Sequence, residues 1–406
     1  MSASKYQHPE ATPRPDEASP AGGASPAERT LDEIRAAAWL KVLLFFLFAL
    51  VLIGGTVRIT HSGLSIPEWP IIYYGPEKTK PSLLPPFTEQ GWETAHKTYH
   101  SEVIDLGVHG DPRTMQTFKR EFKLEYSHRF TAAVVSILFL ALIVQTIRKP
   151  VLRRRIGVLI GVSAAVLFAQ IVLGGVVVKT HTPALSVSYH LGMAFIYIGM
   201  ILWMALRLGR PEGTPLPPRP SRHTWLAWMA AAVCFLQIFS GGLVANTEAG
   251  RSYNTWPLMA ESLIPPANAM WQSHFEPAIL NLVENKILVQ WTHRWFAFIV
   301  AAAVILLVVR LVTSPLSPFG RWMARASVFV LVTQILLGIV TLLEAVQPWI
   351  LGIAHLGVGL ILFLILLGLV YELKTNVAVY EYETASVPAS KPGKESRLEV
   401  QAASLS

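Results

Sequence analysis

The chain has 406 residues, of which 52% are apolar and only 15% are charged. Soluble domains carry about 25% charged residues, so this deficit indicates that much of the surface contacts lipid rather than water. The single cysteine, Cys234, excludes an internal disulfide. The net charge of +8 does not indicate nucleic-acid binding, because the basic residues cluster in short loops between apolar segments.

Polar tails are predicted at both ends of the chain. Residues 1–37 are rich in Pro, Ala and Ser, and residues 374–406 are again polar, so we expect both to be disordered. The first tail lacks the apolar core of a signal peptide, and it contains acids such as Glu10 and Asp16, which transit peptides avoid. We therefore expect a protein of the bacterial plasma membrane.

Eight apolar segments are long enough to cross a bilayer, which takes about 20 residues. They cover 39–59, 127–147, 156–178, 185–206, 225–245, 287–311, 322–343 and 349–371. The connections at 148–155, 207–222 and 310–321 are basic, and the positive-inside rule places them in the cytoplasm. Both termini are then cytoplasmic, and the long connections after the first and fifth helices face outward.

The chain contains an internal repeat. Residues 54–70 and 241–257 share GGxVxxTxxGxSxxxWP, which is eight identities in 17 positions. Further matches follow in the same order: His128-Arg129 with His293-Arg294, Gln170–Gly174 with Gln334–Gly338, and His190-Leu-Gly with His355-Leu-Gly. Each half has four helices, so we predict an all-α integral membrane protein of two parallel four-helix bundles, related by a pseudo-twofold axis along the membrane normal. The predicted units are 38–210 and 224–373, joined by a linker at 211–223.

Four of the twelve histidines lie within the apolar spans, in the outer third of helices 2, 4, 6 and 8: His128, His190, His293 and His355. Ionisable groups inside a membrane are costly and usually functional. Imidazole is a common axial ligand of haem iron, and a bundle core is a usual place for a flat cofactor. The alternative is that these histidines only form hydrogen bonds between helices. Their repetition at equivalent positions favours haem ligands, and zinc would need further ligands that the sequence does not offer.

Two other residue types near these histidines leave the interpretation open. The glycines at 54–55, 174–175, 241–242 and 338 allow either close helix packing or room for a porphyrin. Arg58, Arg129 and Arg294, at the outer ends of helices, are suited to haem propionates, but they are equally suited to anchoring helix ends at the membrane interface.

One carboxylate occurs in the first half alone. Glu125 lies three residues before His128, on the same helical face, whereas the equivalent residue in the second half is Gln290. A carboxylate near a cofactor can act as a base or stabilise positive charge. We predict chemistry in the first half and an electron-transfer or structural haem in the second. The alternative is that Glu125 is a solvated residue at a helix start.

Three motifs together resemble the haem A synthase family: GGTVRITHSGLSIPEWP at 54–70, EYSHR at 125–129 and AGRSYNTWPLM at 249–259. The resemblance runs from the first helix to the eighth. It implies a membrane enzyme that oxidises a methyl group of haem O to the formyl group of haem A for terminal oxidases. It also implies substrate haem at His128 and His190, haem B at His293 and His355, and Glu125 as the catalytic carboxylate.

The resemblance further implies partners: haem O synthase as the source of haem O, an electron donor or acceptor of unidentified nature, and cytochrome oxidase assembly factors. Homo-oligomerisation is left open. Some relatives carry a cysteine pair in the first outer loop, and this chain has none there, which excludes a role for thiols. Two rivals are weighed against the enzyme. A di-haem b-type membrane cytochrome would explain the histidines but not Glu125, and a parallel-repeat transporter would need polar groups near mid-membrane.

Overall fold

Eight long helices dominate the computed structural model, which describes residues 29–70, 73–74, 81–105, 114–379 and 381. They are α1 (Leu31–Ile59), α3 (Met115–Arg148), α4 (Pro150–Lys179), α5 (Ala184–Gly209), α6 (Thr224–Asn246), α9 (Lys286–Leu311), α10 (Pro318–Leu343) and α11 (Ile350–Thr375). All eight are long and apolar enough to cross a membrane. Large apolar side chains such as Phe45, Val158 and Phe329 lie on their outer faces. The prediction of an all-α integral membrane protein with eight spans is confirmed.

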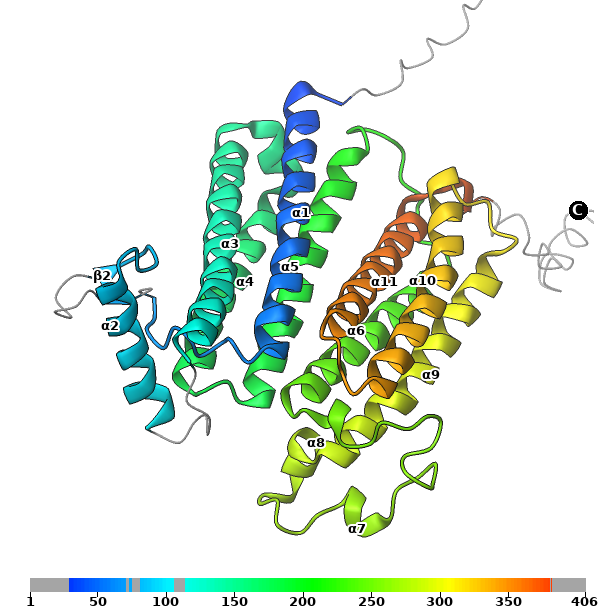
Figure 1. The fold of residues 1–406 in the computed structure, drawn as a ribbon. Helices are drawn as coiled ribbons and strands as arrows, with labels where there is room; N and C mark the ends of the chain where they lie inside the picture. Colours follow the sequence, from blue (N-terminus) through cyan, green and yellow to red (C-terminus); the bar gives the residue numbers. More distant parts are fainter. Residues whose placement is uncertain (1–28, 71–72, 75–80, 106–113, 380, 382–406) are drawn as a thin grey trace, which may run out of the picture.

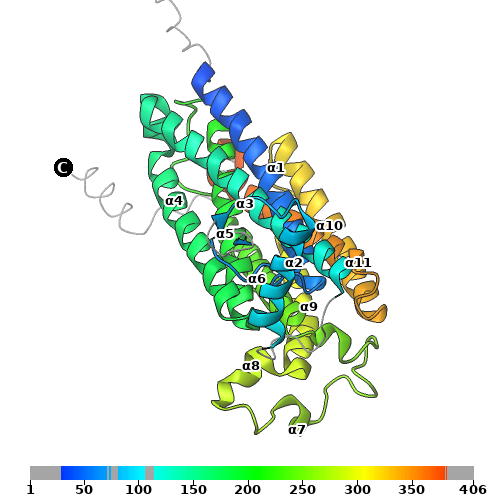
Figure 2. The same cartoon turned by 60° about the vertical axis from the view of Figure 1, so that its left-hand side comes forward.

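The long helices form two groups that stand side by side (Figures 1 and 2). In the first, α1 packs against α3 and α5, and α4 packs against both of these. In the second, α6 packs against α9 and α11, and α10 packs against both of these. The groups meet where α5 contacts α6 and α1 contacts α11. Each helix contact within the first group has an equivalent contact within the second, as a parallel repeat requires. The pseudo-twofold relation between the groups stays a prediction.

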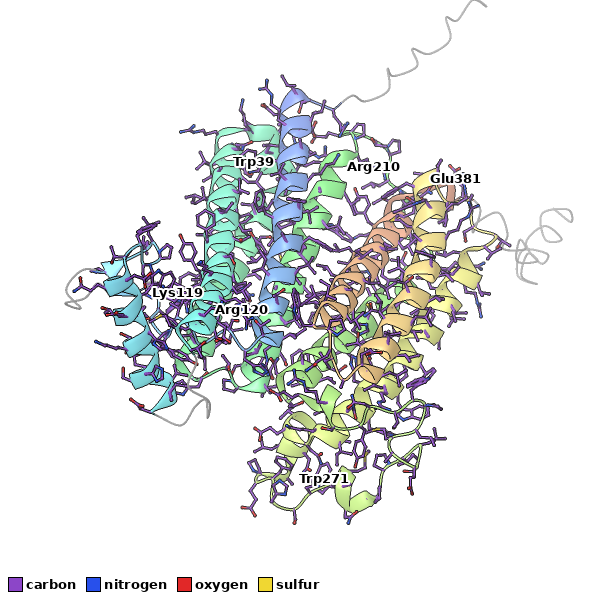
Figure 3. The ribbon with its side chains drawn as sticks, viewed as in Figure 1. Trp39, Lys119, Arg120, Arg210, Trp271 and Glu381 are labelled. Carbon is purple, nitrogen blue, oxygen red and sulfur yellow. The ribbon has the colours of Figure 1, made fainter. Side chains whose placement is uncertain are left out.

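Short elements lie at one end of the bundle. After α1 come β1 (Tyr73–Tyr74) and β2 (Pro81–Ser82), which pair antiparallel, then α2 (Glu89–Tyr99) and the π-helix η1 (His100–Ile104). After α6 come η2 (Ala249–Arg251), α7 (Ala267–Met270), η3 (Ala278–Leu280) and α8 (Asn281–Glu284). Figure 3 shows Trp271 and Lys119 near this end, and Trp39 and Arg210 near the other.

The first helix begins earlier than its apolar residues predict. Residues 31–37 were expected to be part of a disordered tail, but they form the first turns of α1. Thr30 and Glu33 make a capping box, in which each side chain accepts a hydrogen bond from the other residue's backbone N–H. Glu33 also forms a buried ion pair with Arg155 of α4. These polar contacts extend the helix beyond its apolar part. Residues 1–28 and 382–406 of the expected tails lie outside the described residues.

The start of α3 also extends beyond its predicted span. The helix begins at Met115, twelve residues before the predicted start at 127, and Thr114 caps it by accepting from the N–H of Thr117. Phe118 and Phe122 on this extension pack against Trp92 of α2. They form an apolar cluster with residues of the connection between α1 and α3, and this cluster packs that connection against the start of α3.

At the other end of the chain, α11 runs to Thr375, so residues 374–375 are helical rather than part of a tail.

Candidate functional site

Each of the four membrane histidines lies against a glycine of a neighbouring long helix. The contacts are His128 on Gly54 (α3 on α1), His190 on Gly174 (α5 on α4), His293 on Gly241 (α9 on α6) and His355 on Gly338 (α11 on α10). A Cβ atom at these glycines would lie between 2.8 Å and 3.3 Å from the ring, closer than ordinary contact. The four glycines therefore give the imidazoles their places between the helices.

In the Gly-Gly pairs of α1 and α6, the second glycine has a different neighbour. A Cβ at Gly55 would meet Leu356 of α11, and one at Gly242 would meet Ser188 of α5. Both contacts cross between the two helix groups. Hence in these two pairs the first glycine accommodates a histidine, whereas the second allows the two groups to approach closely.

The histidines are brought together in two pairs. The ring centroids of His293 and His355 are 6.5 Å apart, with their planes at 78°. His190 lies within electrostatic range of His128. Over the described residues, no group of three or more His, Cys, Asp or Glu side chains could hold a bare metal ion. A pair of imidazoles is instead the ligand set for a metal whose other ligands come from a ring, as in haem.

The surroundings of the histidines also fit a bound haem. The Nδ1 atoms of His190 and His355 are buried and have no hydrogen-bond partner among the described residues. Buried polar atoms are almost always paired, so such orphans need an explanation. Two nearby imidazoles, each packed against a glycine, are a ligand set that suits haem iron.

Glu125 is buried and paired in the first helix group. It is 4% exposed, and its Oε1 accepts a hydrogen bond of 2.8 Å from Nε of Arg129. Because α3 begins ten residues earlier, Glu125 is not at a helix start, and the interpretation as a solvated capping residue is wrong. The equivalent residue in the second group is Gln290. It is 2% exposed, and its side-chain Nε2 donates a hydrogen bond to the backbone carbonyl of Tyr253.

Arg129 and Arg294 hold equivalent loops. Arg129 donates to the carbonyls of Ile66 and Glu68, each at 2.6 Å. Arg294 donates to the carbonyls of Tyr253 at 2.6 Å and Thr255 at 2.8 Å, the matching positions of the repeat. The difference lies at Nε, which donates to a carboxylate in Arg129 but has no partner in Arg294 among the residues described.

The third arginine, Arg58, also binds protein groups. It donates to the side chain of Asn246 and, at 2.7 Å, to its backbone carbonyl, which joins α1 to the end of α6. The contacts of all three arginines agree with a role in anchoring helix ends and loops.

Trp69 and Glu68 lie close to Arg129, a contact that the sequence did not predict. The Arg129 guanidinium is 5.5 Å from the centroid of the Trp69 ring, and that ring packs on Gly175 of α4. The second half has Ile339 in place of this glycine, and the equivalent Trp256 stacks on Phe298 instead. This difference between the repeats is the signal that marks Trp69. Burial, reinforced by the nearby Glu102, raises the pKa of the Glu68 carboxyl above its usual range.

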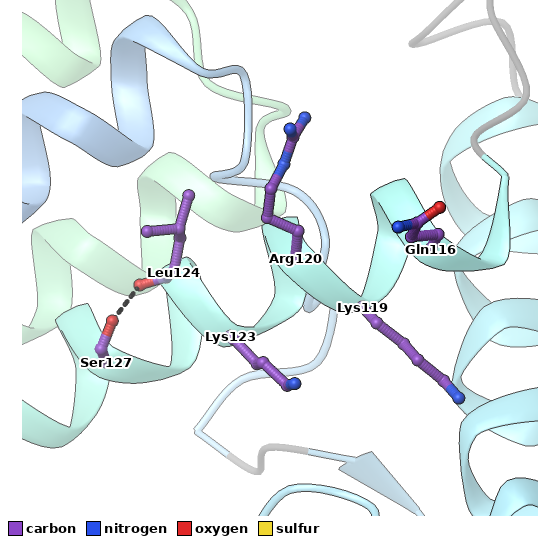
Figure 4. Close-up of a pocket in the computed structure, with 6 residues that line it drawn as sticks. All are labelled: Gln116, Lys119, Arg120, Lys123, Leu124 and Ser127. Carbon is purple, nitrogen blue, oxygen red and sulfur yellow. Dashed lines mark hydrogen bonds between the residues drawn. The ribbon is translucent and has the colours of Figure 1, made fainter.

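A groove of about 580 Å³ lies on the N-terminal part of α3 (Figure 4). It is lined by Gln116, Lys119, Arg120, Lys123, Leu124 and Ser127. None of the paired histidines or Glu125 contributes to it, and Lys119 is bound to Glu89 of α2. We do not assign the groove to the histidine site.

The fold and the site define a multi-pass membrane protein with two pairs of half-buried imidazoles and, in the first helix group, the buried carboxylate Glu125 one helical turn from His128. Residues 37–367 match the model of the family described as cytochrome oxidase assembly protein. The chain is 32% identical to the heme A synthase of Nitrosospira multiformis, over 83% of this chain and 93% of that protein. It is 34% identical to the heme A synthase of Sinorhizobium fredii, over 78% of this chain and 84% of that protein. The chain belongs to the haem A synthase family, and the resemblance drawn from its motifs is confirmed.

Proposed function

We propose that this chain is a haem A synthase, which oxidises one methyl group of haem O to the formyl group of haem A. Family membership over most of the chain supports this activity. The observation that carries it within the structure is the buried Glu125, which lies one helical turn from a paired imidazole in one helix group and has no counterpart in the other. A protein that only carried electrons through two equivalent haems would have no need of this asymmetry.

The reaction sets requirements that the residues must meet. Converting a methyl to a formyl group takes oxygen from water or dioxygen and, with water as the source, releases four protons and four electrons. An electron acceptor outside this chain is therefore needed, or dioxygen together with an electron donor. In the proposal, His128 and His190 hold the haem substrate and orient its edge, and His293 and His355 hold haem B. When bound, haem B supplies one-electron redox chemistry.

Glu125 is proposed as the group that accepts a proton from the reacting centre. Arg129 donates to Oε1 alone, so Oε2 is the oxygen available for proton transfer. The Arg129 guanidinium fixes the carboxylate, and the same guanidinium binds the outer loop through Ile66 and Glu68. Loop, arginine and carboxylate therefore form one unit, which orients the base and helps to exclude water from it.

The test compares Glu125→Gln with Glu121→Gln, a buried carboxylate one turn earlier on α3. Each variant is co-expressed with haem O synthase, and the extracted pigments are separated by chromatography. We expect Glu125→Gln to keep its haem and lose the formyl product, while Glu121→Gln makes the product. Product at the wild-type level in Glu125→Gln would remove the catalytic assignment. A wild-type protein that yields haem B and no haem O or haem A would favour the alternative, a di-haem b-type cytochrome.

We also propose the membrane in which the protein lies, the roles of its two halves and its partners. The protein is placed in a bacterial plasma membrane with both termini in the cytoplasm, because the connections at 148–155 and 207–222 are basic. Residues 38–210 form the substrate-binding half and 224–373 the haem B half. Haem O synthase supplies the substrate, and assembly factors of cytochrome oxidase receive the product.

A further inference from the structure

Three of the four glycines that face a histidine are preceded, four residues earlier, by a glutamine. The pairs are Gln170 with Gly174, Gln237 with Gly241, and Gln334 with Gly338. Residues four apart share a face of a helix, so each glutamine lies one turn from the histidine contact. The equivalent residue before Gly54 is Leu50. His128 is therefore the one ring of the four that meets a helix without this glutamine.

The glutamines contact their histidines directly. Nε2 of Gln170 donates to the backbone carbonyl of His190 at 2.9 Å. Nε2 of Gln237 donates to the carbonyl of His293 at 3.0 Å and lies 3.2 Å from the Nδ1 atom of that ring. In the third pair, Nε2 of Gln334 lies 3.4 Å from Nε2 of His355. Leu50 can make no such bond with His128. Among the described residues neither the His128 ring nor the His190 ring has a hydrogen-bond partner, but His190 has the amide of Gln170 beside it.

Unpaired atoms indicate a further role for these amides. The Oε1 atoms of Gln170, Gln237 and Gln334 are buried without a hydrogen-bond partner among the described residues, and so are Nδ1 of His190 and of His355. An amide oxygen accepts from an imidazole N–H, and the two ends of a side-chain amide exchange by a flip. When Nε2 of a histidine binds a metal, Nδ1 keeps its proton and normally donates it to an acceptor nearby.

We propose that Gln170, Gln237 and Gln334 are positioning residues that orient three of the four iron-binding histidines. Leu50 leaves His128 without such support, which makes it the most readily released ligand. The inference rests on the proposed function, in which the first half takes up haem O and releases haem A while the second half keeps its haem B. A substrate site must exchange its haem at each turnover, and a ligand without a supporting hydrogen bond binds more weakly.

The test measures haem release. The full-length protein is produced without haem O synthase, loaded with two ferric haem B per chain, and mixed with excess apomyoglobin as the haem acceptor. Wild-type protein is expected to release haem in a fast and a slow phase. Leu50→Gln should slow the fast phase about 10- to 100-fold, the usual effect of a supporting partner on metal affinity. Leu50→Met, which has similar size and no amide, should keep the wild-type fast phase.

A second variant tests the same inference from the other half. Gln334→Met should accelerate the slow phase by a similar factor and raise the reduction potential of that haem, because a ligand without its acceptor is a weaker electron donor. Gln334 is chosen over Gln237 because Nδ1 of His293 also lies 2.8 Å from Oγ of Ser240, whereas Nδ1 of His355 has no partner among the described residues. A merely structural glutamine would not change the potential. An unchanged fast phase in fully loaded Leu50→Gln would overturn the proposal. If that variant does not fold, an unchanged slow phase and potential in Gln334→Met would overturn it.

Failure of the two proposals can be told apart. The release assay uses haem B and needs no methyl oxidation, so it reports on the ligands alone. If two phases respond as expected but wild-type protein makes no haem A from haem O, then the proposed function fails and the roles of the glutamines stand. If haem A is made and the phases do not respond, then only the glutamine assignment fails.

Discussion

Replacing Gly338 with alanine tests whether the glycines determine the position of the histidine rings. The new Cβ would lie 2.8 Å from Cε1 of His355, whereas ordinary contact begins at 3.4 Å. The ring or the helix must therefore move by about 0.6 Å, the difference between these two distances. Overpacking of this kind costs about 1–3 kcal/mol. Because about 1.4 kcal/mol corresponds to a factor of ten, haem affinity in the second half should fall about 5- to 140-fold.

The assay is the haem content of purified protein, from absorption spectra and extracted pigments, followed by the rate of haem loss. Gly174→Ala should have a smaller effect, since its Cβ would stand 3.3 Å from His190. Gly161→Ala is the matched control, because no atom lies within 4 Å of a Cβ at that place on α4. It should be neutral or slightly stabilising, because alanine favours a helix over glycine by about 1 kcal/mol. Full haem content and a wild-type rate of haem loss in Gly338→Ala would refute the reasoning.

Three further predictions concern residues that support the site. Arg129→Lys should lower the melting temperature and speed proteolysis of the first outer loop, because each lost hydrogen bond to a charged group is worth about 1.5–3 kcal/mol; unchanged cleavage rates would contradict this. Glu33→Gln should destabilise the protein by about 3–5 kcal/mol in thermal unfolding, because Arg155 loses its buried ion-pair partner, and Arg155→Met in the same background should recover part of the loss. Glu68→Gln should melt above the wild type at pH 8 and together with it at pH 4. Burial raises the pKa of Glu68 above its ordinary 4.5, so the folded state loses stability as pH rises through the folded pKa, and the glutamine does not ionise. Melting curves of wild type and Glu68→Gln that differ equally at both pH values would be inconsistent with that pKa.

The spans could be predicted from the sequence, because a membrane helix is defined by a long run of apolar residues. The same reasoning misplaced the ends where polar residues continue a helix. Glu33 and Arg155 extend α1 through a buried ion pair, and Phe118 extends α3 through packing on Trp92. Such contacts join residues far apart in the chain, so no local pattern shows them.

Some features of the candidate site could likewise be predicted from the sequence, and others could not. The internal repeat made the four histidines and Glu125 stand out, because a duplicated chain reveals which positions both halves keep and which only one keeps. The partners of these residues did not follow from the repeat. Arg129 and Arg294 were considered for propionates, yet both bind carbonyls of the outer loops. Trp69 and the glutamines gained importance only when their neighbours were known.

The sequence by itself determined a membrane protein of eight helices, its duplication, its family and the residue types that can bind haem iron. These follow from composition, periodicity and identity, which are properties of the chain in order. The tertiary structure decided which glycine faces which histidine, and that Glu125 is buried beside Arg129 rather than solvated. The physical reason is that van der Waals contact and hydrogen bonding act over a few ångströms in space, and helix packing alone sets which residues come that close.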